Sequence, residues 1–159
     1  MRSLAFAACL TVASPALAAE TLPPRAPGLW ESKTTSADGV TTAKQCVGEG
    51  TDAAAVAAMG GNRQCSKNAV TKTADGWTSE TECKIGEITA TSRGSFTGDF
   101  KRQVRTELET TLTGVPGQSG PTPRKTVIEA RRLGDCEPGQ APGDIILSDG
   151  KVVKTPGAK

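Results

Sequence analysis

The sequence contains no histidine and no tyrosine among its 159 residues. The lack of histidine excludes Ser–His–Asp and Cys–His catalysis, and it excludes metal sites built on imidazole. A general base would have to be a carboxylate, a lysine or the N-terminal amine. Neither a G-x-S-x-G nucleophile elbow nor a phosphate-binding glycine loop occurs. We therefore do not expect an enzyme, and we expect no cofactor and no metal.

Two pairs of acidic residues are the remaining candidates for acid–base chemistry. Glu80 and Glu82 lie two residues apart on a predicted strand, and so do Glu107 and Glu109. This spacing puts the members of each pair side by side on one face of the strand. Because basic residues neighbour both pairs, the pattern favours a solvated outer face of a sheet over a catalytic site.

Large apolar residues are scarce and charges nearly balance. Leu, Ile, Val and Phe make up 27 of the 159 residues, a lower share than the roughly 20% that a globular core contains. No stretch after residue 18 is long and apolar enough for a transmembrane segment. The 19 basic and 17 acidic residues are interspersed, with a net charge of +2. Without a basic patch, nucleic acid is not an expected partner.

The first eighteen residues have the order of a secretion signal. Arg2 forms a positive n-region, Leu4 to Val12 form an apolar h-region, and Ala16-Leu17-Ala18 supplies small residues for cleavage. Cleavage is expected after Ala18, with the bond after Ala19 as the alternative. A short buried helix and a lipoprotein site at Cys9 are the other interpretations, but the apolar run continues past Cys9. We expect an exported protein.

Four cysteines remain in the mature chain, at positions 46, 65, 83 and 136. An even number of cysteines in an exported protein predicts two disulfides. The intervals of 19, 18 and 53 residues lack the close ligand pairs that a structural zinc site uses. Disulfides would also offset the thin apolar content of so small a domain.

Most of the mature chain has the period-two alternation of strands, and the 21 threonines of the whole sequence favour extended backbone. We predict a mainly β fold, namely a curved antiparallel sheet of about seven strands, or a partly closed barrel, with one short helix and a C-terminal hairpin. Residues 19–27 form an irregular lead-in, residues 28–136 the disulfide-bonded domain, and residues 137–159 a Pro/Gly linker and hairpin. Strands are expected at Gly28–Ser36, Val40–Val47, Trp77–Ile85, Ile88–Phe96, from Phe100 to Leu112, and at Lys125–Leu133.

The helix and the hairpin have specific signals. Thr51 or Asp52 can cap a helix that continues from Ala53 to Met59 and ends at Gly60-Gly61. Asp149-Gly150 lies between two β-prone runs, Ile145–Ser148 and Lys151–Lys154, which is a strong hairpin signal. The hairpin either packs on the domain as an edge element or pairs as a ribbon with the edge of a partner's sheet.

Four aromatic residues of the mature chain are candidate ligand contacts. A curved sheet with a docked helix leaves a concave, partly apolar surface that a small molecule can occupy. The alternative is that these residues form the core of a small domain. Among them, the residue at the start of a strand beside a turn is the first one to test. The four are Trp77, Trp30, Phe96 and Phe100.

Several short motifs together resemble a bacterial exported family, domain of unknown function 3617. They are Pro27-Gly28-Leu29-Trp30-Glu31, Cys46-Val47 at a helix entrance, Cys65 and Cys83 around a hairpin, Gly98-Asp99-Phe100, and an Arg-x-Gly-x-Cys pattern at residues 132–136. The resemblance covers about residues 27–136. It implies an exported, disulfide-bonded, β-rich domain of bacterial envelopes, which points to the periplasm of a Gram-negative bacterium. It implies no activity and no functional residues.

The disulfide pairing has three formal solutions. A hairpin around residues 74–76 places Cys65 nearly opposite Cys83, with a mismatch that a bulge can absorb. Strand parity in a meander then leaves Cys46 to join Cys136, if the helix carries the chain between the two ends of the sheet. This argument favours Cys65–Cys83 with Cys46–Cys136. The competing set, Cys46–Cys65 with Cys83–Cys136, would close the helical excursion instead.

These features together favour a noncatalytic binding module for a small molecule or a lipid, expected to be monomeric. The alternative is a structural or protein-interaction factor of the envelope that docks through the C-terminal hairpin. Its partner would then be an envelope protein.

Overall fold

The computed structural model describes residues 20–53 and 64–154. The expected signal peptide at residues 1–18 lies outside the described residues, and so does most of the expected helix, including Gly60-Gly61. Within the described ranges, residues 51–53 are helical and nearly everything else is strand, turn or bend. No helix in these ranges has the length and apolar character needed to cross a membrane.

The described residues form one antiparallel sheet of nine strands, in the order β3-β4-β5-β6-β7-β1-β2-β8-β9. The mainly β, antiparallel prediction is thereby confirmed. The predicted count of about seven strands is too low, because the C-terminal hairpin is hydrogen-bonded into the sheet beside β2. The strands are β1 (Gly28–Ser36), β2 (Gly39–Val47), β3 (Gln64–Lys72), β4 (Trp77–Ile85), β5 (Ile88–Gly98), β6 (Gln103–Thr113), β7 (Thr122–Gly134), β8 (Asp144–Leu147) and β9 (Val152–Lys154).

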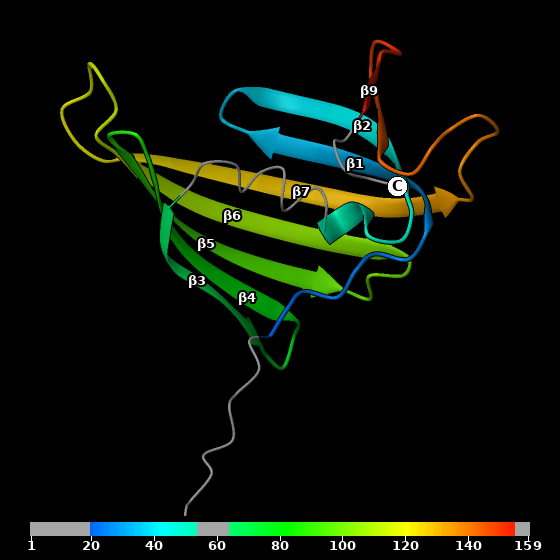
Figure 1. The fold of residues 1–159 in the computed structure, drawn as a ribbon, viewed down its shortest axis with the longest axis horizontal. Helices are drawn as coiled ribbons and strands as arrows, with labels where there is room; N and C mark the ends of the chain where they lie inside the picture. The colour runs from blue at the N-terminus through cyan, green and yellow to red at the C-terminus, as the bar shows by residue number, and fades with distance from the viewer. Residues whose placement is uncertain (1–19, 54–63, 155–159) are drawn as a thin grey trace, which may run out of the picture.

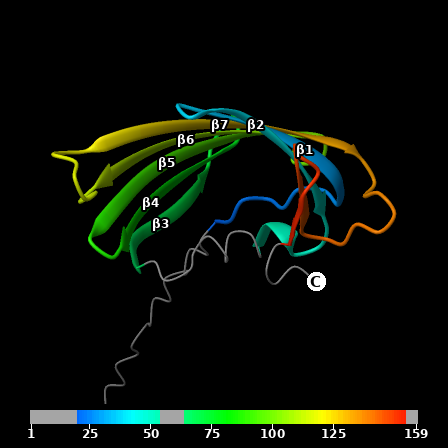
Figure 2. The same ribbon diagram turned by 90° about the horizontal axis from the view of Figure 1, so that it is seen from above.

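The sheet is arched but not closed (Figures 1 and 2). In the described part of the chain, β3 and β9 are its two edges and do not pair with each other, so the barrel alternative is wrong. A closed barrel requires the two edge strands of the sheet to hydrogen-bond to each other with a fixed offset in register. Here one edge strand belongs to the middle of the chain and the other to its end, and the arch leaves them on opposite sides.

The two faces of the arch differ in composition because side chains alternate along each strand. We call the face that carries Trp30, Val104 and Ala130 the inner face and the opposite one the outer face. The buried core lies on the inner face and comprises Trp30, Val47, Phe100, Val104 and Ala130, with Trp77 and Phe96 packed against it. Charged residues of the strands lie mostly on the outer face, as the register of the pairs requires.

Residues 20–27, the lead-in, run beneath the arch from the end of β3 to the start of β1 (Figure 2). The Glu20 carboxylate accepts a hydrogen bond from the Lys72 amide at one edge of the sheet. At the other end, the Ala26 amide donates to the Phe100 carbonyl over 2.8 Å. Residues 20–26 form neither helix nor strand, and the lead-in covers part of the inner face.

The C-terminal hairpin continues the sheet. β8 pairs with β2, and β9 pairs with β8 and forms the edge. The Gly143 amide donates to the Cys46 carbonyl over 2.8 Å, which fixes the point where the linker returns to the sheet. The hairpin therefore packs on the domain through β8, while the outer edge of β9 has no neighbouring strand among the described residues.

Candidate functional site

Two disulfides hold the domain, Cys46–Cys136 and Cys65–Cys83. This is the set that the hairpin and parity arguments favour. Cys65 lies directly opposite Cys83 because a register shift between Cys65 and Lys67 absorbs the mismatch. Two disulfides indicate a non-reducing environment.

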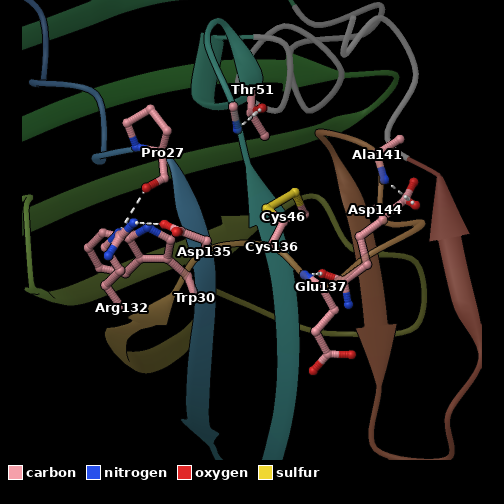
Figure 3. The surroundings of a disulfide bond; sticks show 12 residues. Pro27, Trp30, Cys46, Thr51, Arg132, Asp135, Cys136, Glu137, Ala141 and Asp144 are labelled. Atoms are coloured by element: carbon pink, nitrogen blue, oxygen red, sulfur yellow. Dashed lines mark hydrogen bonds and ion pairs between the residues drawn. A yellow bond between two sulfur atoms is a disulfide. The ribbon is translucent and has the colours of Figure 1, made fainter.

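The start of β1 is held by contacts that surround the Cys46–Cys136 disulfide (Figure 3). Arg132 Nε donates to the Pro27 carbonyl and Arg132 Nη2 to the Asp135 carboxylate, each over 2.8 Å. Trp30 Nε1 donates to the Ala26 carbonyl, also over 2.8 Å. The motifs at residues 27–31 and 132–136 thus meet in space, and their contacts anchor the lead-in under the arch.

A second anchor is Arg25, whose side chain is only 16% exposed. Its guanidinium donates to the Asp52 carboxylate over 2.6 Å and to Gln45 Oε1 over 2.7 Å. The same group lies 5.4 Å from the centroid of the Trp30 ring, which is cation–π distance. The predicted capping residue Asp52 therefore binds the lead-in. The other candidate cap, Thr51, is fully buried and accepts from the Gly48 amide.

The structure brings the four candidate aromatic residues into one cluster on the inner face. Trp30 and Phe100 are 0% and 6% exposed and belong to the core. Trp77 and Phe96 lie directly opposite each other on β4 and β5, and both are half-buried. The Trp77 and Phe100 rings meet edge to face, with centroids 5.1 Å apart. Two of the four thus serve mainly as core, and the other two keep accessible ring surface.

The Gly98-Asp99-Phe100 turn builds one end of this cluster. The Asp99 carboxylate accepts hydrogen bonds from the amides of Lys101, Arg102 and Gln103 over 2.7 to 3.1 Å. These bonds, first of all the one from Arg102, hold the pKa of Asp99 below its usual value. Phe100 has a φ of 56°, a left-handed conformation that bulky residues rarely adopt. This backbone turns its ring into the core, whereas the sequence pattern placed Phe100 on a strand face.

Beyond the aromatic cluster, the inner face combines half-buried aliphatic residues with small hydroxyl residues. Ser92 and Thr110 face each other across β5 and β6 and share a hydrogen bond of 2.9 Å. The two hydroxyl groups of this pair satisfy each other. The half-buried aliphatic side chains include Val70, Ile88, Leu108, Leu112 and Ile128.

The outer face carries both pairs of glutamates that are the candidates for acid–base chemistry. Glu80 forms an ion pair with Lys67, and that contact lowers the pKa of Glu80. Arg105 likewise lowers the pKa of Glu107, to which it donates over 2.9 Å. A general acid needs a raised pKa, so these shifts run in the opposite direction. They suit the ion pairs of a solvated sheet face.

An open hollow of about 540 Å³ also lies on the outer face. Its charged groups largely pair with each other, since Arg131 contacts Glu31 over 2.7 Å and Arg105 contacts Glu129 over 2.6 Å. In the described ranges, no group of three or more Cys, Asp or Glu side chains is placed to hold a metal ion. The hollow is lined by Glu31, Lys33, Gln103, Arg105, Glu129 and Arg131, among others.

Local sequence patterns predict no role for Arg25, Arg132 or Asp99. Asp99 and Arg132 lie inside short motifs, but their hydrogen-bond partners are 2 to 105 residues away. Arg25 lies in a proline-rich segment without any motif, and its contact to Asp52 spans 27 residues. No local pattern could have identified that contact.

Comparison with known proteins gives one result. The family model described as "Protein of unknown function (DUF3617)" matches residues 25–136. None of the curated proteins and none of the solved structures matches the chain. The matched segment begins at Arg25, the lead-in residue that binds Asp52, and it ends at Cys136, the half-cystine that closes the longer disulfide loop.

Proposed function

The chain belongs to the DUF3617 family, whose function is unknown, and we propose that it is an exported periplasmic protein that binds a small apolar molecule or a lipid, without catalysis, on the inner face of its sheet. The proposal concerns the mature chain after removal of the signal peptide expected at residues 1–18.

One observation carries this proposal: the aromatic cluster is only partly buried. A small domain with few large apolar residues gains most by burying its aromatic rings completely. Trp77 and Phe96 nevertheless remain half-buried at the open end of the cluster. On the same face, Leu108 lies opposite Gly94, two residues from Phe96, and Ile128 follows Phe96 across the sheet with Thr106 between them. An exposed apolar surface of this kind is where a hydrophobic ligand gains binding energy.

Export to the periplasm is supported by two independent features. The N-terminal segment has the charge, apolar run and small residues of a signal peptide. The two disulfides require an oxidising compartment for their formation. Fractionation of a Gram-negative host that expresses the whole gene tests this part. We expect a periplasmic protein that begins at Ala19 and carries two disulfides, and a reduced or unprocessed cytoplasmic product would contradict it.

Titration with a neutral apolar fluorophore, N-phenyl-1-naphthylamine, tests binding. We expect saturable enhancement of the fluorophore emission together with quenching of tryptophan emission. Trp77→Ala should weaken binding by about fivefold, because it removes an aromatic contact. Trp77→Leu, which retains apolar volume, should lose less.

The matched control is Val40→Ala, which changes an apolar residue that is 58% exposed at the turn between β1 and β2. It should leave the titration unchanged. Thermal melts of all variants establish that they are folded. Absence of saturable binding by the unaltered protein would overturn the proposal, and so would equal effects of the Val40 and Trp77 substitutions.

A second candidate function is docking to an envelope protein through the C-terminal hairpin. The observation in its favour is that Val152 and Val153 of the edge strand β9 are 53% and 47% exposed. An unpaired edge with apolar side chains can accept a strand from a partner. Because Leu147 and Lys151 are hydrogen-bonded, the alternation of antiparallel pairs turns the Val152 amide toward the outer edge, and replacing Val152 by Pro removes one amide donor from this edge. If the hairpin docks, this variant should lose a co-purified envelope protein that a Val152→Thr control retains.

A further inference from the structure

Charges of both signs lie on the outer face of strands β1–β7, whereas the inner face of these strands carries positive charges only. Register assigns every glutamate of strands β1–β7 to the outer face, opposite the row that contains Trp30, Ala130 and Val104. The charged residues that the register places on the inner face of these strands are all basic. The outer-face glutamates are Glu31, Glu80, Glu82, Glu107, Glu109 and Glu129, and the inner-face basic residues are Lys72, Arg124 and Arg132.

Two of the three basic residues already have partners. Arg132 contacts Pro27 and Asp135, and Arg124 lies 3.7 Å from the Asp38 carboxylate. Lys72 differs, because its ammonium group contacts the ring of Trp77 and no carboxylate within ion-pair distance among the described residues. Its Nζ lies 6.0 Å from the Trp77 centroid, and the two residues are directly opposite on β3 and β4.

Lys72 therefore stands at the rim of the half-buried aromatic surface with an available positive charge. Trp77, Phe96 and Ile128 continue from it across the sheet in one row, through Thr106. From β4 to β7 this row covers three interstrand spacings, or about 14 Å, which is comparable with an extended dodecyl chain. A cation at one end of an apolar row is complementary to an amphiphile with an anionic head and an apolar tail.

We propose that the inner face selects single-chain amphiphiles with an anionic head group, a carboxylate or a phosphate, and that Lys72 Nζ binds this head group while the tail lies along Trp77 and Phe96. This inference rests on the proposed function, since it names the ligand class of the same surface. Glu20 also lies at this end, but its carboxylate is bound to the Lys72 backbone amide. The ammonium group of Lys72 lies over the Trp77 ring.

Calorimetric titration of the disulfide-bonded protein with three matched ligands tests the inference: dodecanoate, dodecan-1-ol and dodecyltrimethylammonium, each below its aggregation concentration. We expect dodecanoate to bind about three- to fivefold tighter than the alcohol at low salt, as one exposed charge pair provides. The cationic ligand should bind more weakly than the alcohol. In 0.5 M NaCl the preference should shrink, because salt screens exposed charges.

Lys72→Gln should abolish the preference for dodecanoate over dodecan-1-ol, and Lys72→Glu should reverse it. Lys67→Gln is the matched control, because Lys67 is on the same strand but on the outer face, paired with Glu80. Both positions are exposed, so the variants are expected to fold, and circular dichroism melts verify this. Dodecyl phosphate in place of dodecanoate tests the phosphate head group. Vesicles of phosphatidylglycerol distinguish a lipid surface from a free amphiphile.

The outcomes separate the two proposals. Equal affinities for dodecanoate and dodecan-1-ol would overturn this inference and leave the binding function standing. A preference that survives Lys72→Gln would overturn the role of Lys72. Binding to vesicles with no binding of the monomeric amphiphiles would overturn the single-chain ligand class. If none of the ligands binds, the proposed function itself fails.

Discussion

At the scale of single residues, backbone conformation and the space next to the backbone decide which side chain a position can accept. Phe100 adopts a left-handed conformation that costs about 1–2 kcal/mol for a residue with a side chain. Burial of its ring, which is 6% exposed, and the bond from Ala26 to its carbonyl offset that cost. Gly28 shows the reverse situation, in which no side chain fits.

Gly28→Ala should be strongly destabilising. Gly28 has a φ of 137°, and a Cβ atom there would lie 2.3 Å from the Gly134 carbonyl oxygen and 2.6 Å from Arg132 Nε. The backbone oxygen cannot yield without displacing β7, so strain and steric overlap combine. We expect a loss of about 2–4 kcal/mol in the free energy of unfolding, measured by urea denaturation.

Gly39→Ala is the matched control for this prediction. Gly39 has a similar φ of 124°, but an added Cβ meets nothing within 4 Å. Its substitution should cost only the conformational strain, about 1–2 kcal/mol. Equal losses at the two positions would show that the contacts with Gly134 and Arg132 do not matter.

At the scale of elements, local alternation was sufficient to predict most strands and the faces of their residues. Trp77 to Ile85 and Ile88 to Phe96 pair as two period-two strands, so their predicted faces coincide with the register. The alternation places Phe100 in a strand because its spacing to Val104 fits a period of two. The chain instead turns at this point, because three backbone amides donate hydrogen bonds to the Asp99 carboxylate, and the alternation pattern does not reveal these bonds.

The pairing of distant elements could not be predicted, because it depends on contacts between segments far apart in the sequence. Nothing in the composition of residues 144–147 indicates that they pair with residues 43–45. For the same reason the candidate aromatic residues were identified, but their division into two core and two half-buried rings was not. The anchoring of the lead-in by Arg25 likewise required the three-dimensional structure.

The C-terminal hairpin contains a buried carboxylate that should make its stability depend on pH. Asp144 is 4% exposed and accepts hydrogen bonds from Lys154 Nζ over 2.7 Å and from the Ala141 amide over 3.0 Å. These contacts, first of all the one from Lys154, lower its pKa from the usual 3.8. The stabilisation is complete above pH 3.8 and is lost as the pH falls through the lower, folded-state pKa.

Amide hydrogen exchange in β8 and β9 at pH 6 and in steps below pH 4 measures this dependence. Protection of these strands should fall with the pH, after correction for intrinsic exchange, and Asp144→Asn should lower it at pH 6 and flatten the profile. Asp38→Asn is the control, since the Asp38 side chain is 84% exposed in a turn. A hairpin whose protection in the Asp144 variant follows the unaltered protein at every pH would contradict this assignment.

At the scale of the whole molecule, an open arch with few large apolar residues depends on its covalent links. Among the described residues, the core cluster comprises five buried residues with two more packed against it, and the two edge strands do not pair with each other. Cys46–Cys136 joins the end of β2 to the segment after β7, across β1, and spans 90 residues of sequence. Cys65–Cys83 joins adjacent strands and spans 18 residues.

The two disulfides should therefore contribute unequally to stability. In the chain-entropy description, a link stabilises by restricting the unfolded chain, and the effect grows with the logarithm of the loop length. Removing Cys46–Cys136 by paired alanine substitutions should cost about 4–5 kcal/mol, against about 3 kcal/mol for Cys65–Cys83. Urea denaturation of the two double variants, with the unaltered protein as reference, measures the difference. An equal or larger loss for the Cys65–Cys83 pair would show that the hairpin β3–β4, and not the closure across β1, is the element that limits the stability of the arch.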